Sequence, residues 1–295
     1  DDQQALAEAA AAALAADISR YPDDGRLIAA WPSLIGHATA TDALWRRAKE
    51  LADRFGLGIS AHMGPAPDDL EWYRAHTGES PIAHLAGIGV LGPNVNLVHM
   101  VHIEPGDVAL LAGSGTNVTF CPAAALKGGY GASAVGLFPE MANAGVNLAL
   151  GTDGADTHDM LRMASQAAGL FRDARMDTGL FPAHQALEMA TLNGAKALGM
   201  ADTIGSLAPG MKADIVLHDT RRHELTPLSD PVRQLVWSAS GNGIHSVWVD
   251  GRRVIDGYRA TTIDEDALLA DAQRAAEAAL ARSGLPRTGA WPVVG

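Results

Sequence analysis

Three apolar segments of the sequence each carry, at or near their end, a side chain that can bind a metal or transfer a proton. His62 closes the run GLGISAH, His99 lies near the end of NVNLVHMVH, and Asp153 closes VNLALGTD. Imidazole nitrogens and carboxylate oxygens are compact donors that together suit zinc or iron. A single histidine at the end of a strand is more often a buried structural residue. Because such groups recur, the pattern indicates a metal site.

These side chains follow segments that we expect to be parallel strands. Apolar runs alternate with helical stretches, such as residues 41–55 and 105–114, which is typical of a sheet covered by helices. In a parallel barrel the functional side chains lie at the carboxyl ends of the strands. The expected strands are residues 27–31, 57–62, 95–102, 117–121 and 146–153.

The pattern changes after about residue 203. Residues 204–219, IGSLAPGMKADIVLHD, predict a turn followed by a strand, and further strands are expected at 235–238, 244–249 and 253–255. Asp250-Gly251 is a hairpin signal. We therefore predict three regions: the main α/β domain at 1–203, β-sandwich strands at 204–258, and a C-terminal helix and tail at 259–295.

The composition limits the partners. With 47% hydrophobic and 19% charged residues, the chain is predicted to be globular. A formal net charge of −12 disfavours nucleic acid and anionic membrane surfaces as partners, so a small-molecule substrate is expected. The single cysteine, Cys121, excludes an internal disulfide and fits a reducing compartment, for which the cytoplasm is the default. No apolar run is long enough to predict a membrane span.

Four sequence segments carry a family resemblance. They are LVHMVHIEPGDVALLAGSGTNVTFCP, GVNLALGTDGADTHDML, EMATLNGAKALGM, and IGSLAPGMKADIVLHD followed by VWVDGRRV. In this order they resemble the amidohydrolase superfamily, specifically the branch of cytosine deaminases, triazine hydrolases and methylthioadenosine/adenosylhomocysteine deaminases. The resemblance implies a distorted TIM (β/α)8 barrel with a small composite β-sandwich. The expected strands of this chain resemble the fourth to the eighth of that barrel.

The resemblance also implies roles for the three residues. His62 is similar to the metal-binding histidine that ends the fifth strand. Asp153 is similar to the eighth-strand aspartate, which touches the metal and carries a proton from the attacking water to the leaving group. His99 is similar to the sixth-strand histidine that hydrogen-bonds the substrate or the attacking hydroxide. The implied cofactor is one divalent metal, zinc first, with iron or manganese as alternatives, and many relatives are homo-oligomers.

Five other residues are candidates for substrate binding. His102 lies beside His99, with a structural role as the alternative. Lys127 and Tyr130 lie in the loop CPAAALKGGYG, where a solvent-facing lysine and a packing tyrosine are the alternatives. Trp31 and His37 are candidates for the pocket mouth, because aromatic rings suit flat heterocycles, with core packing as the alternative for the tryptophan. Cys121 is expected to be a small packed residue and not a nucleophile.

The sequence departs from the family pattern in two ways. It contains no HxH pair, which relatives carry on the first strand as further metal ligands, and it lacks the first three strands, so we expect it to be part of a longer protein. Three residues after His62, where deaminases of this branch place a proton-relaying glutamate, stands Pro65. Proline cannot transfer a proton, which weakens the case for the usual deamination.

The sequence leaves three hypotheses open. The first is a metal-dependent amidohydrolase that uses activated water to hydrolyse a C–N bond, in a deamination-type reaction, of a small aminated N-heterocycle. The second is a related hydrolase that releases chloride or an alkylamine, or cleaves an amide. The third is a catalytically inactive barrel that binds a small molecule.

Overall fold

The computed structural model describes residues 2–22, 27–36, 40–154 and 157–284. The chain forms two compact units. The first contains residues 1–211 and 220–243, and the second contains residues 212–219 and 244–295.

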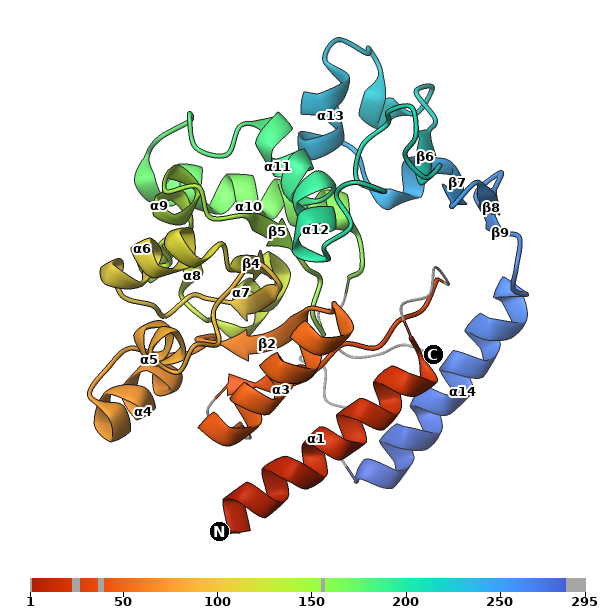
Figure 1. The fold of residues 1–295 in the computed structure, drawn as a ribbon. Helices are drawn as coiled ribbons and strands as arrows, with labels where there is room; N and C mark the ends of the chain where they lie inside the picture. Colours follow the sequence, from red (N-terminus) through yellow and green to blue (C-terminus); the bar gives the residue numbers. More distant parts are fainter. Residues whose placement is uncertain (1, 23–26, 37–39, 155–156, 285–295) are drawn as a thin grey trace. The chain divides into compact units, whose positions relative to one another are not determined.

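The first unit is built on a parallel sheet of five strands in sequence order, β1-β2-β3-β4-β5. Each strand pairs in parallel with the next, and helices connect them (Figure 1). This confirms the predicted α/β fold. Within the described residues, β1 and β5 are edge strands and the sheet does not close into a barrel. The strands are β1 Ser33–Ile35, β2 Ile59–Met63, β3 Val95–His99, β4 Asn117–Phe120 and β5 Leu148–Leu150.

Both helical stretches that the sequence predicts between strands, residues 41–55 and 105–114, are confirmed as helices. The predicted helix at 41–55 is α3, whose first backbone N–H groups are capped by the Thr41 side chain and which ends at the left-handed Gly56. None of the described helices is both long and apolar enough to cross a membrane. The helices are α1 Asp2–Arg20, α3 Asp42–Phe55, α4 Pro67–Thr77, α5 Pro81–Gly87, α6 Pro105–Ser114, α7 Pro122–Gly128, α8 Ala132–Val135, α9 Phe138–Asn143, α10 Met160–Arg175, α11 Ala183–Met189 and α12 Leu192–Ala197.

Aromatic side chains fill the core between the sheet and its helices. Phe120 of β4 packs against Phe138 of α9 with ring centroids 4.2 Å apart, and Phe138 packs against Phe171 of α10 at 5.3 Å. All three rings are almost fully buried, as is Trp45 of α3. Burial of this apolar surface fixes the strands whose carboxyl ends carry the candidate functional residues.

Two predicted strands are wrong. Residues 27–31 do not form a strand; Leu27 and Ile28 are about two-thirds exposed, and the first strand begins after Pro32. Residues 235–238 lie largely in helix α13, Pro231–Trp237, because Asp230 caps the Arg233 N–H and proline starts the helix. In both segments the apolar residues suggested a strand, but apolar residues alone do not determine the backbone conformation.

The second unit is a four-stranded antiparallel sheet followed by a helix. Its strands are β6 Ile215–His218, β7 Ile244–Val249, β8 Arg252–Asp256 and β9 Arg259–Ala260. Asp250 and Gly251 both have positive φ, 49° and 76°, as the predicted hairpin turn requires. Asp264 caps helix α14, Glu265–Ser283.

Candidate active site

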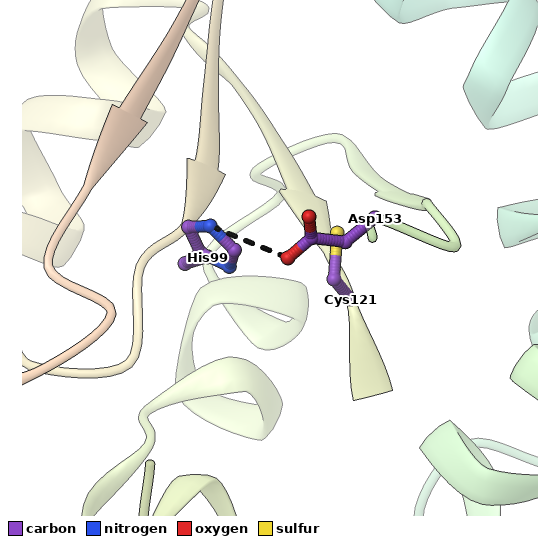
Figure 2. Close-up of side chains that lie close together, drawn as sticks. All are labelled: His99, Cys121 and Asp153. Carbon is purple, nitrogen blue, oxygen red and sulfur yellow. Dashed lines mark ion pairs between the residues drawn. The ribbon is translucent and has the colours of Figure 1, made fainter. Parts of the chain in front are cut away.

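Three side chains converge at the carboxyl ends of neighbouring strands. His99 ends β3, Cys121 follows β4, and Asp153 lies three residues after β5. Their potential ligand atoms all lie within 4.8 Å of one another. His99 Nε2 is 3.8 Å from Asp153 Oδ2, and Figure 2 shows these two side chains pointing toward each other, with Cys121 beside Asp153. The parallel sheet therefore brings together two residues that the sequence singled out.

The backbone at two of these residues is unusual. His99 has φ of 79° and Asp153 has φ of 54°. Both values lie in the left-handed region, which residues other than glycine rarely adopt. Such conformations cost about 1–3 kcal/mol each and cluster at functional sites. The strain at both positions supports a functional role for the cluster, beyond packing.

His62 joins the group from the adjacent strand. In the register of β2 and β3, Met63 pairs with His99. His62 therefore lies one residue before the position opposite His99. The His62 and His99 rings meet edge to face, with centroids 5.0 Å apart. Because His62 is exposed and Asp153 is only partly covered, both can reach a ligand from solvent.

The environment of His99 disfavours its protonated form. Burial lowers the pKa of His99, the neighbouring His62 lowers it further, and the carboxylates of Asp153 and Asp69 oppose the shift. The His99 side chain is 4% exposed. A neutral imidazole in this position can donate one hydrogen bond and accept another, which suits a group that orients a substrate or a water molecule.

Cys121 is closer to the site than the sequence indicated. Its side chain is buried, and a Cβ at Gly151 would lie 3.0 Å from its sulfur, so the thiol occupies space that only glycine leaves open. Burial, together with the negative charge of Asp153, raises the pKa of Cys121 to about 12. The signal that could have revealed this proximity is its position directly after β4, at the same edge of the sheet as the end of β3 that carries His99.

We predict that the Cys121 thiol resists alkylation in the folded protein. The thiolate is the reactive form, and a pKa of about 12 leaves very little of it at neutral pH. Iodoacetamide labelling followed by mass spectrometry checks this: the native protein should stay unlabelled while the denatured protein is labelled fully. Rapid labelling of the native protein would contradict the buried position.

A pocket of about 320 Å³ opens beside the cluster. Asp153, Lys127 and Tyr130 all line it, and the Tyr130 ring meets His99 edge to face with centroids 5.7 Å apart. Two of the predicted substrate-binding residues therefore lie next to the predicted catalytic pair. The remaining lining residues are small: Ala124, Gly128 and Gly154.

The other candidates are placed differently. His102 forms a hydrogen bond between its Nε2 and the Tyr130 carbonyl oxygen at 2.8 Å, which ties the pocket loop to the end of β3. Trp31 is not brought to the cluster: its ring packs against Gly58, just before β2, whereas His62 lies near the other end of that strand. His37 lies outside the described residues.

The turns that follow β2 and β3 are hydrogen-bonded to each other. The Met100 N–H donates to the Met63 carbonyl at 2.9 Å, and the N–H groups of Val101 and His102 donate to the Gly64 carbonyl at 3.0 and 2.9 Å. Since the left-handed backbone of His99 and Met100 leads directly into these contacts, the two turns together hold His62 and His99 in position.

Gly64 is the critical position of this contact. Its φ is +60°, and an added Cβ would lie 2.9 Å from the His102 carbonyl oxygen, a backbone atom that cannot easily move. We predict that Gly64→Ala destabilises the protein by about 1–3 kcal/mol. Chemical denaturation measures this, with Gly89→Ala, which has similar φ and open space around its Cβ, as the control for backbone strain alone. Equal losses in both variants would show that the contact with His102 is unimportant.

Comparisons with known proteins agree with this fold. The model of the amidohydrolase family matches residues 1–254. The chain is 37% identical over 237 residues to a 5-methylthioadenosine/S-adenosylhomocysteine deaminase of Teredinibacter turnerae, covering 79% of this chain and 53% of that protein. The chain belongs to the amidohydrolase family, as predicted.

Solved structures support the same conclusion. An adenosine deaminase from Xanthomonas campestris with bound zinc is 30% identical, with a TM-score of 0.82 over 90% of this chain and 61% of that one. An atrazine chlorohydrolase from Arthrobacter aurescens TC1 complexed with zinc is 20% identical, with a TM-score of 0.80, and shows similarity of fold alone. This confirms a fold of the TIM-barrel type, of which the described strands form part. The chain spans about half the length of the curated relative that it matches.

Proposed function

We propose that the protein is a metal-dependent hydrolase that deaminates a small aminated N-heterocycle. The observation that carries the proposal is the convergence of His62, His99 and Asp153 at neighbouring strand ends, beside a pocket of suitable size for a small molecule. Relatives named as deaminases of 5-methylthioadenosine, S-adenosylhomocysteine and adenosine favour an adenosine-like substrate.

The donor atoms of the site fit a divalent metal. Imidazole and carboxylate are ligands that zinc, iron and manganese share. The ligand atoms of His99 and Asp153 lie within 4.8 Å of one another, and the His62 ring lies against the His99 ring. As the family resemblance implies, His62 and Asp153 would hold the metal. When bound, a divalent metal of this kind lowers the pKa of a water molecule to about 7. Zinc is the first choice, because the adenosine deaminase relative contains it.

Each residue of the site has a separate role in the proposed reaction. The Asp153 carboxylate, partly exposed to the pocket, accepts a proton from water and returns it to the departing amine. His99, neutral and fixed between the His62 and Tyr130 rings, hydrogen-bonds the substrate or the water. Lys127 and Tyr130 contact the substrate from the pocket wall. A small-molecule substrate and a cytoplasmic location, expected from the net charge and the single cysteine, complete the proposal, together with the homo-oligomer that the family resemblance implies.

Pro65 favours a second candidate function. Simple deamination of a ring amine is helped when a side chain protonates the ring nitrogen, and proline has no proton to give. A substrate with a better leaving group depends less on that step. Release of chloride is therefore an alternative reaction for the same site, and release of an alkylamine or cleavage of an amide are further alternatives within the same family.

A substrate panel tests both functions. The protein, supplied with zinc, iron or manganese in turn, is incubated with 5-methylthioadenosine, S-adenosylhomocysteine and adenosine, and with chlorinated, alkylaminated and acylated heterocycles. Ammonia release from the first group supports deamination, whereas chloride, alkylamine or carboxylate release without ammonia supports the alternative. Binding without any turnover would point to an inactive barrel and overturn both.

A further inference from the structure

Asp69 is a buried carboxylate close to the candidate site that no step of the proposed reaction uses. It lies in the first turn of α4 and is 7% exposed. Its Oδ2 accepts a hydrogen bond from the Gly64 N–H at 2.6 Å. A Cβ at Gly36, which follows β1, would lie 3.2 Å from Asp69 Oδ1. The carboxylate therefore lies where the segments that follow β1 and β2 approach each other.

Through Gly64, Asp69 is connected to the turn that follows β3. Gly64 receives hydrogen bonds on its carbonyl from Val101 and His102, and Asp69 holds the opposite, N–H side of the same residue. A single glycine thus carries three hydrogen bonds that link Asp69 to the turn after β3. That turn begins with the left-handed backbone of His99.

Burying a carboxylate costs free energy unless it is compensated. The backbone N–H of Gly64 and the amino end of α4 supply part of this compensation, because helix N-termini favour negative charge. Asp69 therefore acts on the site through its hydrogen bond to Gly64.

We propose that Asp69 is a positioning residue of the metal site, fixing Gly64 and thereby the arrangement of His62 and His99. The inference rests on the proposed function for its consequence, metal binding, but the positioning itself can be measured without metal. Asp69 does not touch the reacting atoms, so its effect passes entirely through the backbone that carries the two histidines.

Three variants separate positioning from general stability. Asp69→Ala removes both the hydrogen bond and the charge. Asp69→Asn keeps an oxygen that can accept from the Gly64 N–H. Asp68→Ala is the matched control, since Asp68 lies in the same first turn of α4 but is exposed.

The first readout is hydrogen exchange of the metal-free protein. In Asp69→Ala, amide exchange at residues 64 and 101–102 should accelerate about tenfold, because the Gly64 N–H loses its acceptor and the turn loosens. Exchange elsewhere, for instance in the core of α10, should stay unchanged. Asp68→Ala should match the wild type at all of these amides, and Asp69→Asn should lie close to it.

The second readout is the affinity for cobalt(II), measured from its absorption spectrum well below the unfolding temperature of each variant. Loss of a residue that orients metal ligands lowers affinity about 10- to 100-fold, which we expect for Asp69→Ala, with recovery in Asp69→Asn. A lower unfolding temperature in Asp69→Ala with unchanged local exchange and unchanged cobalt affinity would overturn the proposal. If the wild type binds no cobalt, the proposed function fails, while the exchange result still decides whether Asp69 fixes the turn.

Discussion

Replacing Asp153 by asparagine is expected to lower kcat/KM by about 10²- to 10⁴-fold at saturating metal, because an amide cannot accept the proton that the carboxylate transfers. The substitution is suited to the position: Asp153 has φ of 54°, and asparagine tolerates the left-handed conformation as well as aspartate does. The fold should therefore be unchanged. Steady-state kinetics on whichever substrate the panel identifies, with circular dichroism beside it, checks this expectation.

The matched control for this variant is Asp173→Asn. Asp173 is an exposed carboxylate in α10, so its loss changes the net charge equally but leaves the pocket intact. Its kcat/KM should equal that of the wild type. Retention of more than about a tenth of the wild-type activity in Asp153→Asn would show that another group transfers the proton.

His99→Asn is expected to lose turnover but to keep its metal. The neutral imidazole of His99 is proposed to orient the substrate or the water, and removing one such hydrogen-bonding group costs about 10²- to 10³-fold in kcat. His62 and Asp153, the proposed ligands, remain. Metal analysis and kinetics on the same preparation measure the two effects separately.

Cys121→Ser provides the comparison for His99→Asn. The donor atoms of His99, Cys121 and Asp153 lie within 4.8 Å of one another, so these three residues could form a metal site that excludes His62. A bound metal would itself deprotonate the thiol, so metal analysis of the variants decides between the two ligand groups. Loss of metal from both His99→Asn and Cys121→Ser, with retention in His62→Ala, would reassign the ligands to this group.

Much of the first unit could be predicted from its sequence. Apolar runs separated by helices with polar caps, such as Thr41 before α3, define parallel strands whose carboxyl ends meet at one edge. That geometry alone brings His99 near Asp153. Prediction failed where an apolar run has nothing to pack against, as at Leu27 and Ile28, because hydrophobicity does not report whether a partner surface exists.

The finer features of the site depend on contacts between distant residues. The sequence gives no sign that His99 adopts a left-handed backbone, since glycine is the usual residue there. The position of the Cys121 sulfur beside Asp153 depends on the absence of a side chain at Gly151, thirty residues later. Asp69 resembles any acidic residue of a first helical turn until its contact with Gly64 is known.

The central claim, that this cluster is a metal site, is tested most directly by elemental analysis. Protein expressed from the complete reading frame, wild type and His62→Ala, is analysed for zinc, iron and manganese, with His184→Ala as a control at an exposed histidine of α11. The account predicts about one metal ion per chain in the wild type and the control, and a clear loss in His62→Ala. No metal in the wild type, even after its addition, or full retention in His62→Ala would contradict it.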